Sequence, residues 1–185
     1  MDELTPDLPP VLGMVLEAGR GSLPYSLVHG EALVACAAWA LGEAEVTLVD
    51  ATVAWETVRD AGQPVVLQDA LCPLTPPEFV VECVRRAVAA DVPVAGVRPV
   101  TDTVKEVSDG RVGATVDREG LAALAAPVVL PPRVVRSLDA APGHDLAALV
   151  TSLDDVELVE APPSGRAVRS EEDVRLLEAL TDPRR

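Results

Sequence analysis

The sequence predicts an α/β fold with a mostly parallel sheet that helices cover on both faces. Short apolar runs, such as VLGMVL at residues 11–16 and the start of PVVLQD at 64–69, are typical of strands buried on both faces. The segments between such runs are rich in helix-forming residues and end near glycines. Strands that alternate with helices along the chain indicate parallel pairing, because each helix returns the chain to the same end of the sheet.

The first half of the chain continues this alternation. Strands are also expected at residues 46–50 and 92–100, and helices at 31–44, 52–62 and 75–90. The last of these helices has the most regular pattern, with apolar residues near i, i+3 and i+4 spacing and prolines in its first turn. Thr75 is expected to be its N-cap.

The second half of the chain has a less regular pattern. Asp109-Gly110 lies between alternating apolar residues and predicts a β-hairpin. Residues 120–141 are expected to form a short helix, a proline-interrupted stretch and a second helix. An exposed or edge strand is expected at 156–162, and Ser170 is expected to cap a terminal helix whose first turn is acidic.

Length and composition limit the classes of function. A chain of 185 residues is long enough for one domain with its own core, which we expect at residues 11–180 between flexible tails at 1–10 and 181–185. The net charge of -15 would repel a phosphate backbone, and aromatic residues make up only 2% of the chain. Nucleic acid is therefore not expected as a partner.

Neither a membrane nor an oxidising compartment is indicated. The N-terminus is acidic and no apolar run reaches membrane length, so a cytoplasmic protein without membrane contact is expected. The three cysteines, Cys36, Cys72 and Cys83, lack the spacing of a metal site and are expected to be reduced and buried.

A glycine-containing loop follows the first predicted strand. The sequence AGRG places Ala18, Gly19, Arg20 and Gly21 where many α/β proteins hold a phosphate, although it is neither a Walker A loop nor a complete dinucleotide fingerprint. Asp69 is expected at the carboxyl end of another strand, which is the edge where ligands of such sheets bind. Taken alone, the loop favours a simple turn between a strand and a helix over a ligand site.

Several motifs in order give the chain a more specific resemblance. AGRG is followed by DALCPLTPPE, PVTDTVK, TVDREGL and a final EDV before a helix. Across most of residues 11–180 this order resembles the methylerythritol phosphate cytidylyltransferases. The resemblance implies a three-layer, Rossmann-like nucleotidyltransferase fold, a projecting hairpin arm at about residues 100–131, and a homodimer joined through that arm. It also implies Mg2+-dependent transfer of CMP from CTP to a polyol phosphate.

The resemblance assigns roles to a small set of retained residues. It implies nucleotide binding by Ala18, Gly19, Gly21 and Asp69, with Asp69 also as the Mg2+ ligand, and polyol phosphate binding by Asp102 and Arg118.

Several positively charged positions of the family are missing. Tyr25 and Ala167 stand where the family has lysines, and Cys72 stands where it has an arginine. The short spacing between VTLVD and VVLQD leaves no room for a glycine-rich segment with which the family contacts the nucleotide.

These departures leave three hypotheses open. The chain is a degenerate member with little or no transfer activity, or an active enzyme in which Arg20, Arg166 and Arg169 replace the lost cations. Alternatively, it is an interaction protein that keeps the arm and associates with a full-length cytidylyltransferase. His144 beside Asp145 is either a general base or an ordinary loop residue.

Overall fold

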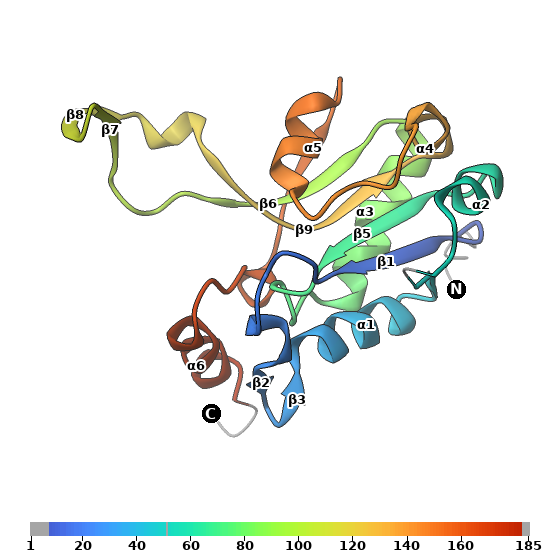
Figure 1. Cartoon of the computed structure of the whole chain (residues 1–185), viewed down its shortest axis with the longest axis horizontal. Helices are drawn as coiled ribbons and strands as arrows, with labels where there is room; N and C mark the ends of the chain where they lie inside the picture. The colour runs from blue at the N-terminus through green and yellow to red at the C-terminus, as the bar shows by residue number, and fades with distance from the viewer. Residues whose placement is uncertain (1–7, 51, 183–185) are drawn as a thin grey trace, which may run out of the picture.

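A six-stranded sheet forms the centre of the protein (Figure 1). The structure is a computed structural model that describes residues 8–50 and 52–182. The strands follow the order β10-β6-β9-β5-β1-β4. Their bounds are β1 Leu12–Leu16, β4 Thr47–Leu48, β5 Val65–Asp69, β6 Val94–Pro99, β9 Ala122–Leu130 and β10 Glu157–Glu160. Only β9 runs antiparallel to its neighbours, so the prediction of a mostly parallel sheet is confirmed.

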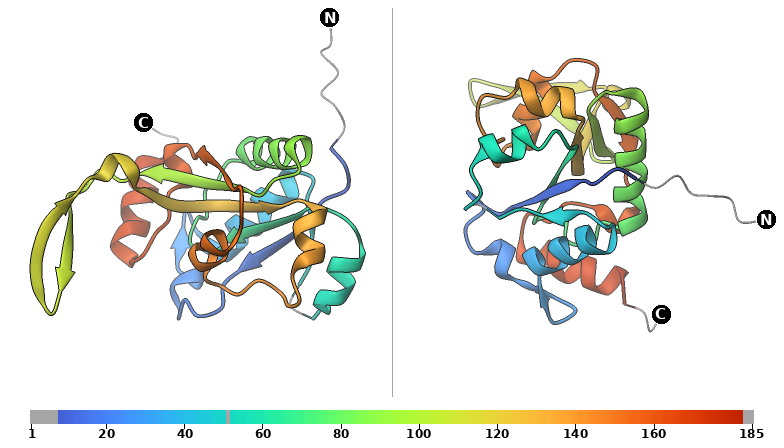
Figure 2. Two further views of the ribbon diagram at one scale, coloured as in Figure 1. Left: turned by 90° about the horizontal axis from the view of Figure 1, so that it is seen from above. Right: turned by 90° about the vertical axis from the view of Figure 1, so that its right-hand side faces the viewer.

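Helices cover both faces of this sheet, as the sequence predicts (Figure 2). On one face lie α1 (Leu33–Glu43) and α3 (Pro77–Ala90), and on the other lie α2 (Trp55–Asp60), α4 (Pro132–Ser137) and α5 (Leu146–Ser152). Each face has its own apolar core, one built around α3 and the other around Trp55 of α2. The two cores and the sheet between them make the three-layer arrangement.

A smaller group of elements packs beside the sheet. It contains a short hairpin, β2 (Leu27–Val28) with β3 (Glu31–Ala32), and the helix α6 (Glu171–Leu180). These elements share a third apolar core formed by Val28, Leu33, Leu71, Val168, Val174 and Leu177. The backbone N–H of His29 also donates to Glu178 Oε1 over 2.8 Å, which ties the hairpin to α6.

The predicted hairpin projects from the sheet as an arm (Figures 1 and 2). It consists of β7 (Val104–Ser108) and β8 (Arg111–Val116), joined by Asp109 and Gly110 with positive φ of 51° and 73°. Val107 pairs directly opposite Val112, and these side chains are 68% and 72% exposed. An apolar cross-strand pair is therefore presented to solvent near the tip.

The prediction for residues 120–141 is wrong in its first part. Where a short helix was expected, the chain forms the long strand β9, and only α4 matches the second helix. The alanine-rich sequence has helical propensity, but Val128, Val129 and Leu130 become fully buried between β5 and β6, and this burial overrides propensity. Residues 122–130, which were expected in the arm, therefore lie in the central sheet.

The expected cap of the helix at 75–90 is also corrected. Pro76 is the N-cap of α3, without a side-chain hydrogen bond, and the buried Thr75 hydroxyl donates to the Cys72 carbonyl oxygen over 2.9 Å. Ser170, in contrast, caps α6 as predicted, because its side chain accepts the Asp173 N–H.

Residues 1–7 and 183–185, which make up most of the two expected tails, lie outside the described residues. In the described part of the chain, no helix is long and apolar enough to cross a membrane.

Candidate functional site

Two adjacent parallel strands bring the glycine-containing loop next to Asp69. Leu16, the last residue of β1, is in register with Asp69, the last residue of β5. The N–H of Ala70 donates to the Leu16 carbonyl oxygen over 3.1 Å, so the two segments that leave the strands begin side by side. Loop and carboxylate therefore meet at the carboxyl edge of the sheet, where ligands bind in folds of this class.

The loop glycines allow a close approach to the segment before α5. Gly19 and Gly21 have positive φ of 74° and 62°, a conformation that glycine adopts without steric cost. A Cβ atom on Gly19 would lie 2.8 Å from His144 Nε2. His144 therefore lies against the loop, and it is exposed. The adjacent Asp145 is the N-cap of α5.

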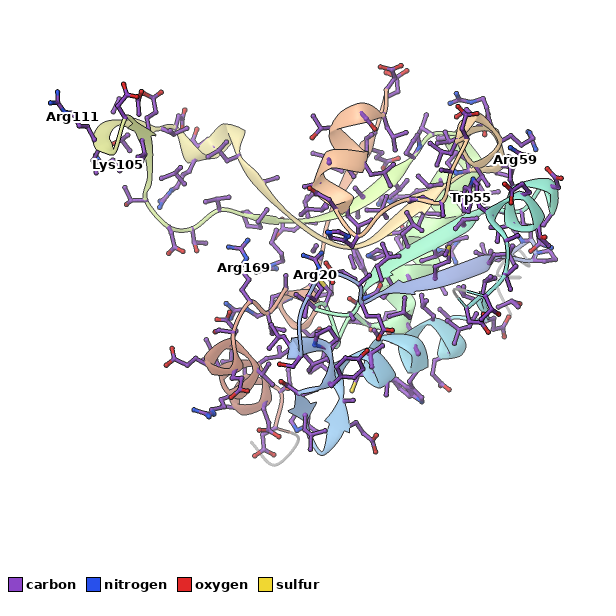
Figure 3. The ribbon with its side chains drawn as sticks, viewed as in Figure 1. Arg20, Trp55, Arg59, Lys105, Arg111 and Arg169 are labelled. Carbon is purple, nitrogen blue, oxygen red and sulfur yellow. The ribbon has the colours of Figure 1, made fainter. Side chains whose placement is uncertain are left out.

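The arginine between the two glycines points inward and closes the site (Figure 3). Arg20 Nη2 lies 2.5 Å from Asp69 Oδ2 and donates to the His144 carbonyl oxygen over 3.1 Å. The other carboxylate oxygen, Asp69 Oδ1, accepts the Leu71 N–H over 2.9 Å. Both oxygens of the carboxylate are therefore already hydrogen-bonded within the protein.

Burial controls the acidity of this carboxyl group. The Asp69 side chain is 14% exposed, and burial raises its pKa, while the hydrogen bond from Leu71 and the charge of Arg20 oppose that rise. An anion that is partly withdrawn from water needs such partners to stay charged.

The donors around Asp69 do not fit a Mg2+ site as they stand. Mg2+ requires near-octahedral oxygen ligands, of which proteins usually supply one or two carboxylates. Both oxygens of Asp69 already have partners. Within residues 8–50 and 52–182, no three His, Cys, Asp or Glu side chains gather closely enough to hold a metal ion.

A buried glutamine supports the loop behind Asp69. Gln68 is fully buried, and its Nε2 donates to the Cys72 carbonyl oxygen over 2.9 Å and to Thr75 Oγ1 over 3.0 Å. Its Oε1 has no hydrogen-bond partner among the described residues. This role of Gln68 was not predicted, and its only signal in the sequence is a polar residue inside an apolar strand.

Comparison with known proteins decides the family. The family model of 2-C-methyl-D-erythritol 4-phosphate cytidylyltransferase matches residues 47–173, which is more than half of the chain. The chain belongs to this cytidylyltransferase family. The resemblance seen in the sequence is thereby confirmed, while the loop at residues 18–21 lies outside the matched range.

Solved structures of cytidylyltransferases share the fold. The enzyme from Thermus thermophilus has a TM-score of 0.67 at 18% identity, with 93% of this chain and 98% of that chain covered. The 4-diphosphocytidyl-2C-methyl-D-erythritol synthase from Anaerococcus prevotii has a TM-score of 0.65 at 14% identity, with 92% and 95% covered. The bifunctional IspDF from Campylobacter jejuni aligns at 14% identity and a TM-score of 0.63, over 90% of this chain and 54% of that one. No curated protein sequence gives a significant match.

The three residues that were expected at cation positions of the cytidylyltransferase pattern, Tyr25, Cys72 and Ala167, carry no positive charge. The hydroxyl of Tyr25 donates to Glu17 over 3.1 Å, and the ring is 59% exposed. Cys72 is 1% exposed, and burial raises the pKa of its thiol to about 12. Ala167 carries no polar group in its side chain.

The residues expected to bind the polyol phosphate lie apart from Asp69, at the base of the arm. Arg118 Nη1 donates to the Thr101 carbonyl oxygen over 2.5 Å, and Asp102 is exposed. Among the described residues, no hydrogen bond or ion pair joins Asp102 or Arg118 to Arg20 or Asp69.

The segment before α6 lies against the loop that follows β5. The N–H of Val168 donates to the Leu71 carbonyl oxygen over 2.8 Å, and Val168 is fully buried. Arg166 and Arg169 flank this contact. Neither side chain has a hydrogen bond or ion pair to any described residue, and Figure 3 places Arg169 between α6 and the strands that lead into the arm.

Proposed function

We propose that this member of the cytidylyltransferase family is inactive or strongly impaired in CTP-dependent CMP transfer. The observation that carries the proposal is the closed Arg20–Asp69 pair, which uses the carboxylate oxygen that a substrate-bound cation would need. The uncharged Tyr25, Cys72 and Ala167 support it.

The energetic argument concerns negative charge in the transition state. Attack on the α-phosphate of CTP builds charge on the bridging oxygen and on pyrophosphate, and removal of one preorganised donor commonly costs about 3 to 4 kcal/mol of transition-state stabilisation. Such losses are not additive. A chain with net charge -15 and Lys105 as its only lysine has few groups that could replace several lost cations.

The resemblance assigns Mg2+ to neutralising the phosphates of CTP. Each oxygen of Asp69 already accepts a hydrogen bond within the protein, so we derive no step through a metal. The proposed remnant of the nucleotide site consists of Ala18, Gly19, Gly21 and Asp69. Binding to this site would be tested with CTP.

A turnover assay tests this proposal. The purified protein is incubated with CTP, Mg2+ and 2-C-methyl-D-erythritol 4-phosphate, and pyrophosphate release is followed. We expect no release above background, and turnover comparable to that of an intact cytidylyltransferase would reject the proposal. The double variant Tyr25→Lys with Ala167→Lys tests the cause, since a gain of activity would show that the missing cations limit the reaction.

Arg166 and Arg169, whose side chains have no partner in the part of the chain that the structure describes, favour a second candidate function. Arg166 and Arg169 flank the contact with the loop after Asp69, so an active enzyme would use them in place of the lysine lost at Ala167. This candidate requires measurable turnover in the native protein and its loss in Arg166→Ala or Arg169→Ala.

Association through the arm is the role we propose to accompany weak catalysis. The exposed Val107 and Val112 pair suits burial against another protein surface. The partner is a second copy of this chain or an intact cytidylyltransferase. Native mass spectrometry of the chain alone and mixed with an intact family member distinguishes a homodimer, a mixed dimer and a monomer, and a monomer in both samples would reject association.

A further inference from the structure

We propose that Arg20 and Arg169 form a phosphate-binding site that needs no divalent cation. The inference concerns the same site as the proposed function and rests on it for the choice of a nucleotide as ligand. It assigns Asp69 the task of holding Arg20 in place, rather than that of binding a metal.

The first argument is the unused hydrogen-bonding capacity of Arg20. Its Nη2 serves Asp69 and the His144 carbonyl oxygen. Its Nε is buried and has no partner among the described residues, and no hydrogen bond from Nη1 is formed there either. A guanidinium carries five N–H donors, and buried donors without partners are rare in folded proteins. An acceptor from a ligand would complete the set.

The second argument is that the fold fixes Arg20 in a defined orientation. Asp69 holds one side of the guanidinium at 2.5 Å, and Asp69 is itself held by the Leu71 N–H. A planar guanidinium that is positioned in advance binds phosphate through parallel N–H···O bonds and loses less entropy than a free side chain.

The third argument concerns charge. Arg20 and Asp69 together are close to neutral, so an anionic ligand needs a further cation. Arg169 is exposed, and its side chain has no ion pair with any described residue, so its charge is available to a ligand. Its backbone N–H is held by Asp173 Oδ2 at 2.8 Å, which fixes the point where the side chain begins.

Figure 3 shows the Arg169 side chain directed from the segment before α6 toward the strands that lead into the arm. The N–H of the preceding residue, Val168, donates to the Leu71 carbonyl oxygen over 2.8 Å, so this segment lies beside the loop that follows Asp69. Arg169 thus supplies a positive charge close to that loop.

The ligand that fits this arrangement is a phosphate or pyrophosphate group, free or as part of a nucleotide. Two guanidinium groups provide charge and directed donors. A Mg2+ ion would compete with Arg20 for Asp69 Oδ2.

Calorimetric titration with CTP and with inorganic pyrophosphate tests the proposal, each in Mg2+ and in EDTA. We expect binding whose affinity changes by no more than about twofold between the two conditions. Arg20→Ala and Arg169→Ala should each weaken binding about tenfold or more in EDTA, because each removes a charge-assisted contact. Arg136→Ala is the matched control, since Arg136 is exposed on α4 without a side-chain partner among the described residues, and its affinity should match the native protein.

Several outcomes would overturn the proposal. These are binding only in Mg2+, affinity unchanged in both arginine variants, or no binding of either probe. Arg20→Lys keeps a positive charge in the loop and should bind more tightly than Arg20→Ala, and circular dichroism of both variants identifies any that fails to fold. Mn2+ titration without nucleotide adds a direct readout, because a Mn2+ site lost in Asp69→Asn would mean that Asp69 is a metal ligand.

The turnover assay distinguishes this proposal from the proposed function. Metal-independent binding with no turnover supports both. Metal-independent binding with turnover keeps the anion site and rejects impaired catalysis, whereas absence of binding rejects the anion site alone.

Discussion

Arg20 and Asp69 lie at positions 49 residues apart, yet they share one short ion pair at the strand ends. From the sequence, Asp69 was expected to be a carboxylate ligand for Mg2+, and Arg20 was one candidate to replace a lost cation. The observed pairing links the two, so the effect of changing either residue depends on the other.

The Arg20–Asp69 pair predicts a measurable coupling in stability. Arg20→Ala leaves a largely buried carboxyl group without its charged partner and should lower the free energy of unfolding by about 1 to 3 kcal/mol. In Arg20→Ala with Asp69→Asn the loss should be smaller than the sum of the two single losses, because the unpaired charge is gone. Urea unfolding of the four proteins gives the coupling, and strictly additive losses would mean that the pair contributes nothing.

The cysteines predict a pattern of thiol reactivity. Burial raises the pKa of Cys72 and of Cys83 to about 12, so both thiols stay protonated near pH 8, and the thiolate is the reactive form. Cys36 is only partly buried, although burial and Glu31 also raise its pKa. Titration of the native protein with a thiol reagent at pH 8 should therefore modify Cys36 first and slowly, with Cys72 and Cys83 reacting after denaturation. Rapid modification of Cys72 in the native state would contradict its burial.

At the scale of the elements, β6 and β9 depend on a close approach of their backbones. Gly96 lies where the register between the two strands shifts. A Cβ atom there would lie 2.9 Å from the Ala126 carbonyl oxygen and 3.2 Å from the Phe79 ring. Neither atom belongs to a flexible side-chain end, so the strand and α3 would have to move.

Gly96→Ala is therefore expected to destabilise the protein by about 1 to 3 kcal/mol, the usual cost of overpacking a core. Gly42→Ala is the control, because Gly42 lies in α1 with no atom within 4 Å of the added Cβ. The control should gain about 0.5 to 1 kcal/mol from helix propensity. Thermal unfolding compares the two, and equal effects would show that the strand contact is not tight.

The elements also show what the sequence could and could not predict. β1, β5 and α3 were predicted because their apolar patterns are local, and Asp109-Gly110 carries the hairpin turn. β9 was missed because its stability comes from pairing with strands far away in the chain. For the same reason the ion pair of Arg20 was not predictable, since it depends on which strands are neighbours. The assignment of Tyr25, Cys72 and Ala167 to family cation positions stays a prediction, because it rests on the order of the sequence motifs alone.

At the scale of the whole molecule, the arm projects from the domain, and most side chains of β7 and β8 are exposed (Figure 2). We therefore expect the domain to fold whatever the identity of these side chains. Changes near the tip should therefore affect association without affecting folding.

Val107→Asp with Val112→Asp tests this separation. We expect the free energy of unfolding to stay within about 0.5 kcal/mol of the native value, as for surface substitutions, and we expect the arm-mediated dimer that we propose to be lost in sedimentation velocity. Val107→Thr with Val112→Thr is the milder control, because threonine keeps β propensity and shape. A dimer that persists in the aspartate variant would place the contact elsewhere.

The third apolar core has a consequence for the order in which the protein is completed during synthesis. Its members Val28, Leu33 and Leu71 leave the ribosome long before Val168, Val174 and Leu177, which close it. The main sheet also needs β9 before β5 and β6 are joined, so the apolar surface beside the strand-end loop is covered last. A nascent chain in which α6 has not yet been synthesised would therefore expose Leu71, two residues from Asp69. At this stage we expect a chaperone to bind the exposed apolar surface.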